Sequence, residues 1–234
     1  MTTPRVAISA TTSAGKRRQL LDLALEVLSM LDLLRLKKVL RNIVVCRCMN
    51  DQNIKSIIIE SFHRQFERRY NTVLLDEGDE PIYRPACESY PKHRIYFAHG
   101  FWNSALHEIA HWCIAGPQRR LETDYGYWYQ PDGRSPELQA EFERFEVKPQ
   151  ALEWLFTSTT SRDFYLSIDN LSGDGGADLG SFKKKVQQQA LSYVREGLPL
   201  RAGLFWQELQ NSFGTSQYTR SYWLDVQELD ILPS

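Results

Sequence analysis

The strongest constraint in the sequence is the pentapeptide His107-Glu108-Ile109-Ala110-His111, which sits in an otherwise uncharged run. Residues from about 103 to 115 predict an α-helix that ends at Gly116-Pro117, where a C-cap glycine and a helix-breaking proline belong. Residues four apart share one helix face, so both imidazoles can reach a single ion. Ionisable groups in an apolar run need partners, and a metal-bearing helix is therefore predicted.

Two histidines alone bind a metal weakly, so we expect a third ligand. Candidates lie on or near the next predicted helix, which begins near Ser135-Pro136; they are Glu137, Glu141, Glu143 and Glu146, with His99 as an outsider. We predict Glu146, because Ala151 shortly after it would let two helices approach closely. Glu143, about one turn earlier, is its main rival.

The ligand types leave two chemistries open. In a zinc hydrolase of the H-E-x-x-H type, the metal lowers the pKa of bound water and Glu108 takes its proton. Two histidines and one carboxylate are also the ligand set of non-haem Fe(II) oxygenases, whose open positions admit O₂ and substrate. Imidazole nitrogen suits zinc, iron, nickel and copper alike.

Composition and charge divide the chain near Met49. A hydrophobic fraction of 42% and a net charge of -1 are ordinary for a globular protein, and indicate neither nucleic-acid nor membrane binding. Residues 1–48, however, hold nine Lys and Arg against three Asp and Glu. We predict that they form a basic N-terminal extension, which is helical or partly disordered, or that they are translated upstream sequence. Residues 49–234 are predicted to form a catalytic domain. The four cysteines show no C-x-x-C pair, which fits a reducing cytosol.

The predicted elements are mostly helical. Periodicity and turn residues predict short strands at 72–75, 81–84 and 94–98, and helices at about 54–69, 103–115, 135–156, 181–196 and 201–213. We expect the helix over 135–156 to kink or restart at Pro149. The predicted fold class is α+β, with a small sheet packed beside the metal-bearing helix.

Several segments resemble the bacterial elongation factor P hydroxylases in continuous order over about residues 54–213. The segments that carry the resemblance are DEGDEPIY (76–83), FAHGF (97–101), SALHEIAHWCIAG (104–116), YGYWY (125–129), PDGR (131–134) and EVKPQAL (146–152). Residues 1–48 lie outside the resemblance, and Met49 falls close to where such a protein would be expected to start.

The resemblance implies a zincin-like fold reused for oxygen chemistry. It implies a metal-dependent monooxygenase, with Fe(II) as the expected metal and O₂ as co-substrate, that hydroxylates the β-lysylated lysine of elongation factor P in the cytoplasm. His107, His111 and Glu146 would be metal ligands, and Glu108 a catalytic, proton-handling group. A zinc metallopeptidase is the alternative.

The modified lysine has a long apolar stem and two amines, so its pocket needs an aromatic wall and carboxylates. We expect Tyr125, Tyr127 and Trp128 to form the wall, and acidic residues of the 76–80 turn, Glu77 and Asp79 among them, to meet the amines.

Overall fold

The computed structural model describes residues 49–123, 134–167 and 179–215. All of them belong to one compact unit, Asn42–Ser234. Within these ranges no helix is both long and apolar enough to cross a membrane. The predicted extension over residues 1–48 lies outside the described residues, so the boundary at Met49 stays a prediction.

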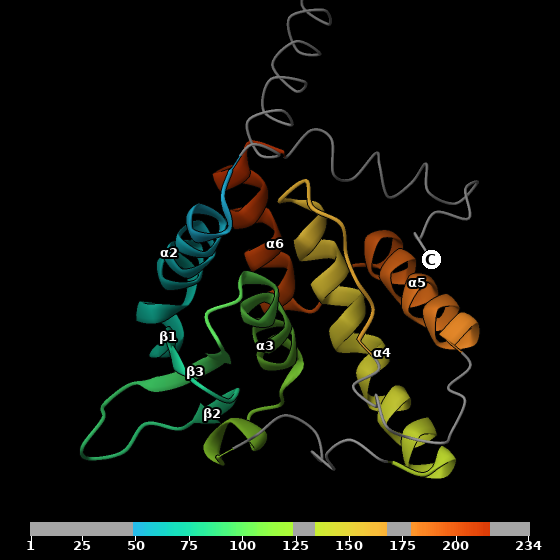
Figure 1. The fold of residues 1–234 in the computed structure, drawn as a ribbon. Coiled ribbons are helices and arrows are strands. Elements are labelled where there is room, and N and C mark those ends of the chain that lie inside the picture. Colours follow the sequence, from blue (N-terminus) through green and yellow to red (C-terminus); the bar gives the residue numbers. More distant parts are fainter. Residues whose placement is uncertain (1–48, 124–133, 168–178, 216–234) are drawn as a thin grey trace, which may run out of the picture. The chain divides into compact units, whose positions relative to one another are not determined.

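A three-stranded sheet forms one side of the fold (Figure 1). Its strands are β1 (Thr72–Gly78), β2 (Ile82–Arg84) and β3 (His93–Ala98), in the order β1-β3-β2. β1 runs parallel to β3, with Leu74 opposite Ile95, and β2 runs antiparallel to β3. All three strands were predicted from the sequence, each to within a few residues.

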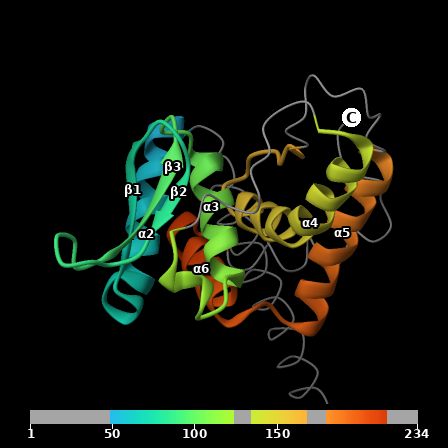
Figure 2. The same cartoon turned by 90° about the horizontal axis from the view of Figure 1, so that it is seen from below.

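Five α-helices complete the described part of the chain: α2 (Asp51–Tyr70), α3 (Trp102–Ile114), α4 (Pro136–Ser158), α5 (Leu179–Glu196) and α6 (Leu200–Phe213). A short 3₁₀ turn, η1 (Arg119–Leu121), follows α3. Figure 2 shows α3 and α6 between the sheet with α2 on one side and the α4–α5 pair on the other. The predicted α+β class with a small sheet beside the H-E-x-x-H helix is confirmed, since α3 packs against β3.

Local sequence explains where α4 begins, but not its course through Pro149. The Ser135 hydroxyl accepts a hydrogen bond from the Leu138 amide, and Pro136 takes the first helical position, as predicted. A restart at Pro149 was wrong, because α4 continues through it as one helix that bends along its length (Figures 1 and 2). Pro149 is buried, and packing around it holds the helix together despite the lost amide donor.

An aromatic core fixes α3 against its neighbours. The rings of Phe62 and Phe66 on α2 lie 5.3 Å and 4.9 Å from the ring of Trp112 on α3. Phe205 on α6 packs 6.1 Å from Phe62. These rings are buried and pack edge to face or tilted. They therefore fix the position of α3 through the side of the helix that faces away from the histidines.

Arg201 secures the end of α3. Its Nη2 atom contacts the carbonyl oxygens of Trp112, Cys113 and Ala115 at 2.7, 3.1 and 2.5 Å. These are the carbonyls that the end of a helix leaves without intrahelical partners, and a guanidinium also complements the negative end of the helix dipole.

Replacing Arg201 with Met should therefore loosen α3. We expect Arg201→Met to lower the free energy of unfolding by about 2 kcal/mol, because several carbonyls lose a charged donor. Urea denaturation of the metal-free protein measures it, with Arg195→Met at the end of α5 as the control, expected within about 0.5 kcal/mol of wild type. Equal effects of the two variants would contradict this role for Arg201.

Candidate metal centre

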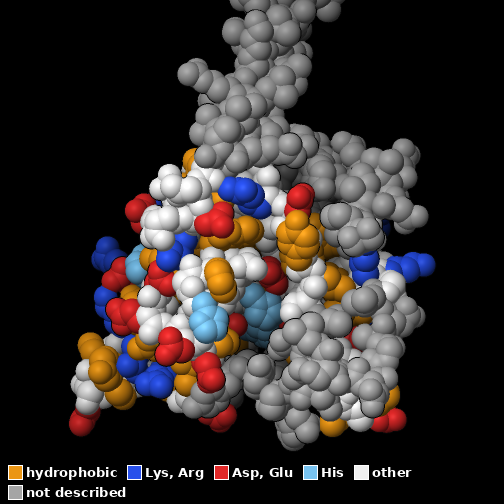
Figure 3. Space-filling model, in the orientation of Figure 1, with side chains coloured by type: hydrophobic (Ala, Val, Ile, Leu, Met, Phe, Trp, Pro, Cys, Tyr) orange, Lys and Arg blue, Asp and Glu red, His pale blue; other side chains and the backbone are white. Residues whose placement is uncertain are grey.

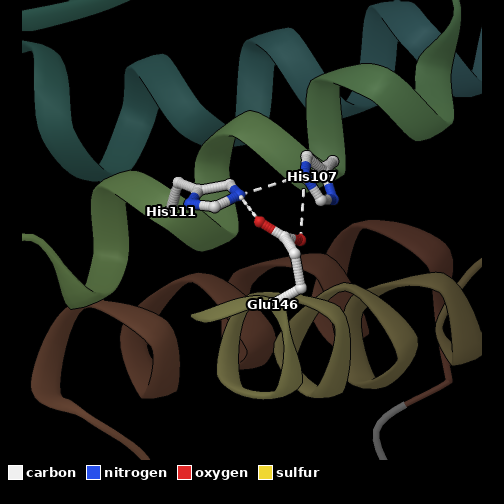
Figure 4. Close-up of side chains that lie close together, drawn as sticks. All are labelled: His107, His111 and Glu146. Carbon is white, nitrogen blue, oxygen red and sulfur yellow. Dashed lines mark hydrogen bonds and ion pairs between the residues drawn. The ribbon is translucent and has the colours of Figure 1, made fainter. Parts of the chain in front are cut away.

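Two facing helices bring three potential metal ligands together. His107 and His111 lie one turn apart on α3, and Glu146 projects toward them from α4 (Figure 4). The two histidine Nε2 atoms are 3.0 Å apart. The Glu146 carboxylate places Oε1 3.2 Å from His111 Nε2 and Oε2 3.6 Å from His107 Nε2.

This geometry fits a transition-metal ion. Among the described residues, one atom from each side chain of this group lies within 4.8 Å of the others. Ligands about 2.0 to 2.2 Å from one ion lie roughly 3 to 3.5 Å from one another, close to the separations seen here. A borderline ion that accepts both imidazole nitrogen and carboxylate oxygen matches the donor set.

The Glu146 carboxylate is buried and held in place. Its side chain is only 5% exposed, and Gln150 Nε2 lies 3.4 Å from its Oε2 while also donating to the carbonyl oxygen of Ser167. Burial alone would raise the pKa of Glu146, but the charge and hydrogen bond of His111, the charge of His107 and the Gln150 amide outweigh it and lower this pKa to about 2. The carboxylate is therefore ionised at neutral pH, as a ligand must be.

Glu153 contacts His107 and was not among the candidate residues from the sequence. Its Oε2 lies 2.8 Å from His107 Nδ1. Ionised carboxylates only accept, so the ring donates through Nδ1–H and turns Nε2 toward Glu146 and His111. Metal-binding histidines commonly use their second nitrogen in this way. Seven residues, or two helical turns, separate Glu146 from Glu153, and that spacing was the signal available in the sequence.

Negative charge around His107 governs the protonation of the metal-free site. Burial lowers the pKa of His107, but the hydrogen bond to Glu153 and the charges of Glu146, Glu153 and Glu108 outweigh it and raise this pKa to about 10. Burial also raises the pKa of Glu108, against the opposing charges of both histidines. The raised pKa makes the protonated form of Glu108 more accessible than for an ordinary carboxyl.

The metal-ligand group is accessible from the protein surface. Histidine side chains show in a hollow on the face seen in Figure 3. A cavity of about 390 Å³ lies beside the metal-ligand group, and Glu153 belongs to its wall together with Gly100, Trp102, Thr157 and Tyr165. The side chains of His107 and His111 are themselves 25% and 11% exposed, so solvent reaches both histidines.

The other candidates from the sequence fall in several places. Glu143 is buried on α4 and His99 sits in the turn before α3 with a positive φ of 51°, and neither belongs to the metal-capable group. Glu77 lies near the end of β1 and Asp79 just beyond it, both exposed and away from the cavity wall. Their substrate role stays a prediction. The predicted aromatic wall, Tyr125, Tyr127 and Trp128, lies outside the described residues.

Comparison with known proteins identifies the family of the chain. Residues 61–223 match the family described as elongation factor P hydroxylase. The elongation factor P lysine hydroxylase of Haemophilus influenzae is 53% identical over 145 residues, which cover 62% of this chain and 81% of that protein.

The matched range contains α3, α4 and the three potential ligands, and it assigns the chain to the hydroxylases, a class of oxidoreductase. The chain belongs to the elongation factor P hydroxylase family.

Three carboxylates on α4 should respond differently to substitution. We expect Glu146→Ala to cause the largest loss of metal affinity, because it removes a ligand. Glu153→Leu should cost about 10- to 100-fold, because His107 loses the acceptor that orients it. Glu143→Leu is the matched control and should bind metal as wild type does. Competition with a chromophoric chelator measures all three, and a loss at Glu143 equal to that at Glu146 would refute the predicted ligand set.

Metal binding should release protons. A ligating imidazole must be neutral, whereas the pKa of His107 near 10 keeps its ring charged in the metal-free protein at pH 7. The apparent affinity for Zn²⁺ should therefore rise with pH, by up to about tenfold per unit from pH 6.5 to 8.5. Calorimetry in two buffers of different ionisation enthalpy counts the protons released. An affinity that stays flat across this range would contradict the assignment.

Proposed function

We propose that the protein is a metal-dependent monooxygenase, with Fe(II) as the metal and O₂ as co-substrate, that hydroxylates the β-lysylated lysine of elongation factor P. The observation that carries the proposal is the convergence of His107, His111 and Glu146 in a chain of this family. The name of the Haemophilus influenzae relative, elongation factor P lysine hydroxylase, supports the choice of protein substrate and of lysine.

The ligand set favours redox chemistry over hydrolysis. Two histidines and one carboxylate occupy one side of an ion and leave other positions open, which is typical of non-haem iron oxygenases. When bound, iron would supply the activation of O₂. Family membership makes the zinc peptidase the weaker alternative, although H-E-x-x-H on its own suits either chemistry.

Each nearby carboxylate has a separate role in this proposal. Glu146 holds the ion, with Gln150 keeping its carboxylate in position. Glu153 fixes the tautomer of His107 through the Nδ1–H hydrogen bond. Glu108 is the catalytic proton-handling group, because burial raises its pKa and so favours the protonated form that a general acid needs.

Further parts of the proposal concern architecture and substrate approach. The small sheet beside the H-E-x-x-H helix is compatible with a zincin-like arrangement, and residues 49–234 would form the catalytic domain. Tyr125, Tyr127, Trp128, Glu77 and Asp79 stay proposed substrate contacts. An enzyme that modifies a translation factor would work in the cytoplasm.

Incubation with elongation factor P tests the proposal. Protein purified without oxygen, loaded with Fe(II) and then given O₂ and a two-electron reductant should add one oxygen atom to the β-lysylated factor, as read from intact mass, while the second oxygen atom leaves as water. We expect His111→Ala to abolish the gain, and Glu108→Gln to reduce the rate by about 10²- to 10⁴-fold, the usual contribution of general acid–base catalysis.

Zinc loading is the matched control for redox chemistry. The zinc-loaded protein should leave the mass unchanged. Release of peptide fragments, or equal turnover with zinc, would contradict a monooxygenase and favour the peptidase.

A further inference from the structure

The cavity beside the metal-ligand group lies between four segments. Its wall comes from the start of α2 (Asp51), the β3–α3 turn and the first turn of α3 (Gly100 to Asn103), α4 (Glu153 and Thr157) and the segment after α4 (Arg162 to Tyr165). Figure 1 shows the beginning of α3 next to the end of α4, which is where these segments meet. The cavity of about 390 Å³ is large enough for the end of a long side chain.

Two polar groups of its wall have unused hydrogen-bonding capacity. Thr157 is 2% exposed, and its buried hydroxyl has no hydrogen-bond partner among the described residues. Glu153 is 7% exposed; its Oε2 pairs with His107, and the described part of the chain shows no partner for its Oε1. Buried polar groups are normally satisfied, so an unpaired hydroxyl beside a half-paired carboxylate indicates an absent donor.

Charge and helix geometry indicate what that donor is. Glu153 and Thr157 lie four residues apart on α4 and so share one face. Three carboxylates, those of Asp51, Glu153 and Asp163, line the cavity against one guanidinium, that of Arg162. Arg162 is engaged elsewhere, donating to the carbonyl oxygen of Met49 at 2.5 Å and lying 3.6 Å from Asp51. A primary ammonium carries three donors and one positive charge, which matches the open acceptors.

We propose that this cavity binds a primary ammonium at the far end of the substrate side chain, between the Glu153 carboxylate and the Thr157 hydroxyl. This inference rests on the proposed function and deepens it. The imidazole ring of His107 separates the two carboxylates, with Nδ1 2.8 Å from Glu153 Oε2 and Nε2 3.6 Å from Glu146 Oε2. When a carbon of the lysine side chain lies at the metal-ligand group, the lysine's own ammonium is too close to that carbon to reach the cavity. A longer side chain that ends in an amine can reach it. The site thus selects the extended side chain.

Thr157→Val tests the inference without disturbing the metal ligands. Valine replaces the hydroxyl with a methyl group of similar size, and it removes a buried unsatisfied group, so stability should not fall. Titration of the full chain with 1,5-diaminopentane, followed by ligand-observed NMR, should show binding that weakens about tenfold in the variant, the usual scale for a hydrogen bond to a charged group. Uncharged 1,5-pentanediol should not bind.

Thr159→Val is the matched control. Thr159 directly follows α4, is fully buried and lies outside the cavity wall. Its hydroxyl donates to the carbonyl oxygen of Phe156 at 2.7 Å. This variant should lose stability yet bind the diamine as wild type does. Thr157→Ser should restore diamine binding, which a purely structural role of Thr157 would not require.

The outcomes separate this inference from the proposed function. With elongation factor P as substrate, Thr157→Val should raise KM for the β-lysylated form about tenfold, with metal content unchanged. If the wild type adds oxygen but Thr157→Val binds the diamine and the factor as tightly as wild type, the cavity assignment is wrong and the proposed function stands. If the wild type never adds oxygen, the proposed function fails, and the diamine titration still decides whether the cavity binds ammonium.

Discussion

The pairing of α3 histidines with α4 carboxylates is the interaction on which the rest of the structure depends. Glu146 meets His111 and His107, and Glu153, two turns further on, meets the other side of His107. Buried carboxylates are costly unless paired, so this register is the one in which the two helices can pack closely. It also sets the ligand group, the tautomer of His107 and the position of the cavity.

The surrounding fold serves to hold that register. The rings of Phe62, Phe66 and Phe205 pack around Trp112 or one another on the far side of α3. Arg201 from α6 secures the carbonyls at the end of α3. The polar face of α3 is thereby left for α4, while the core supplies rigidity at a distance from the chemistry.

Local sequence signals were enough for most elements and for two members of the group that could hold a metal ion. Strict spacing and an apolar context identified His107 and His111, and the Ser135-Pro136 pair identified the start of α4. The sequence offered only the two-turn spacing from Glu146 as a signal for Glu153, and none for Thr157, because the role of each depends on what it faces in the fold, which is a tertiary property. Of the two outcomes predicted at Pro149, the restart does not occur, because packing outweighs the local preference of proline to end a helix.

In the proposed function, His107, His111 and Glu146 hold a catalytic iron that keeps open coordination positions. Crystals of the iron-loaded full chain, measured at the iron absorption edge, test it most directly. We expect one anomalous peak that lies about 2.0 to 2.2 Å from the Nε2 atoms of both histidines and from the Glu146 carboxylate, with the remaining positions around the iron free of protein ligands. A peak elsewhere, or a site closed by a fourth protein ligand, would contradict it.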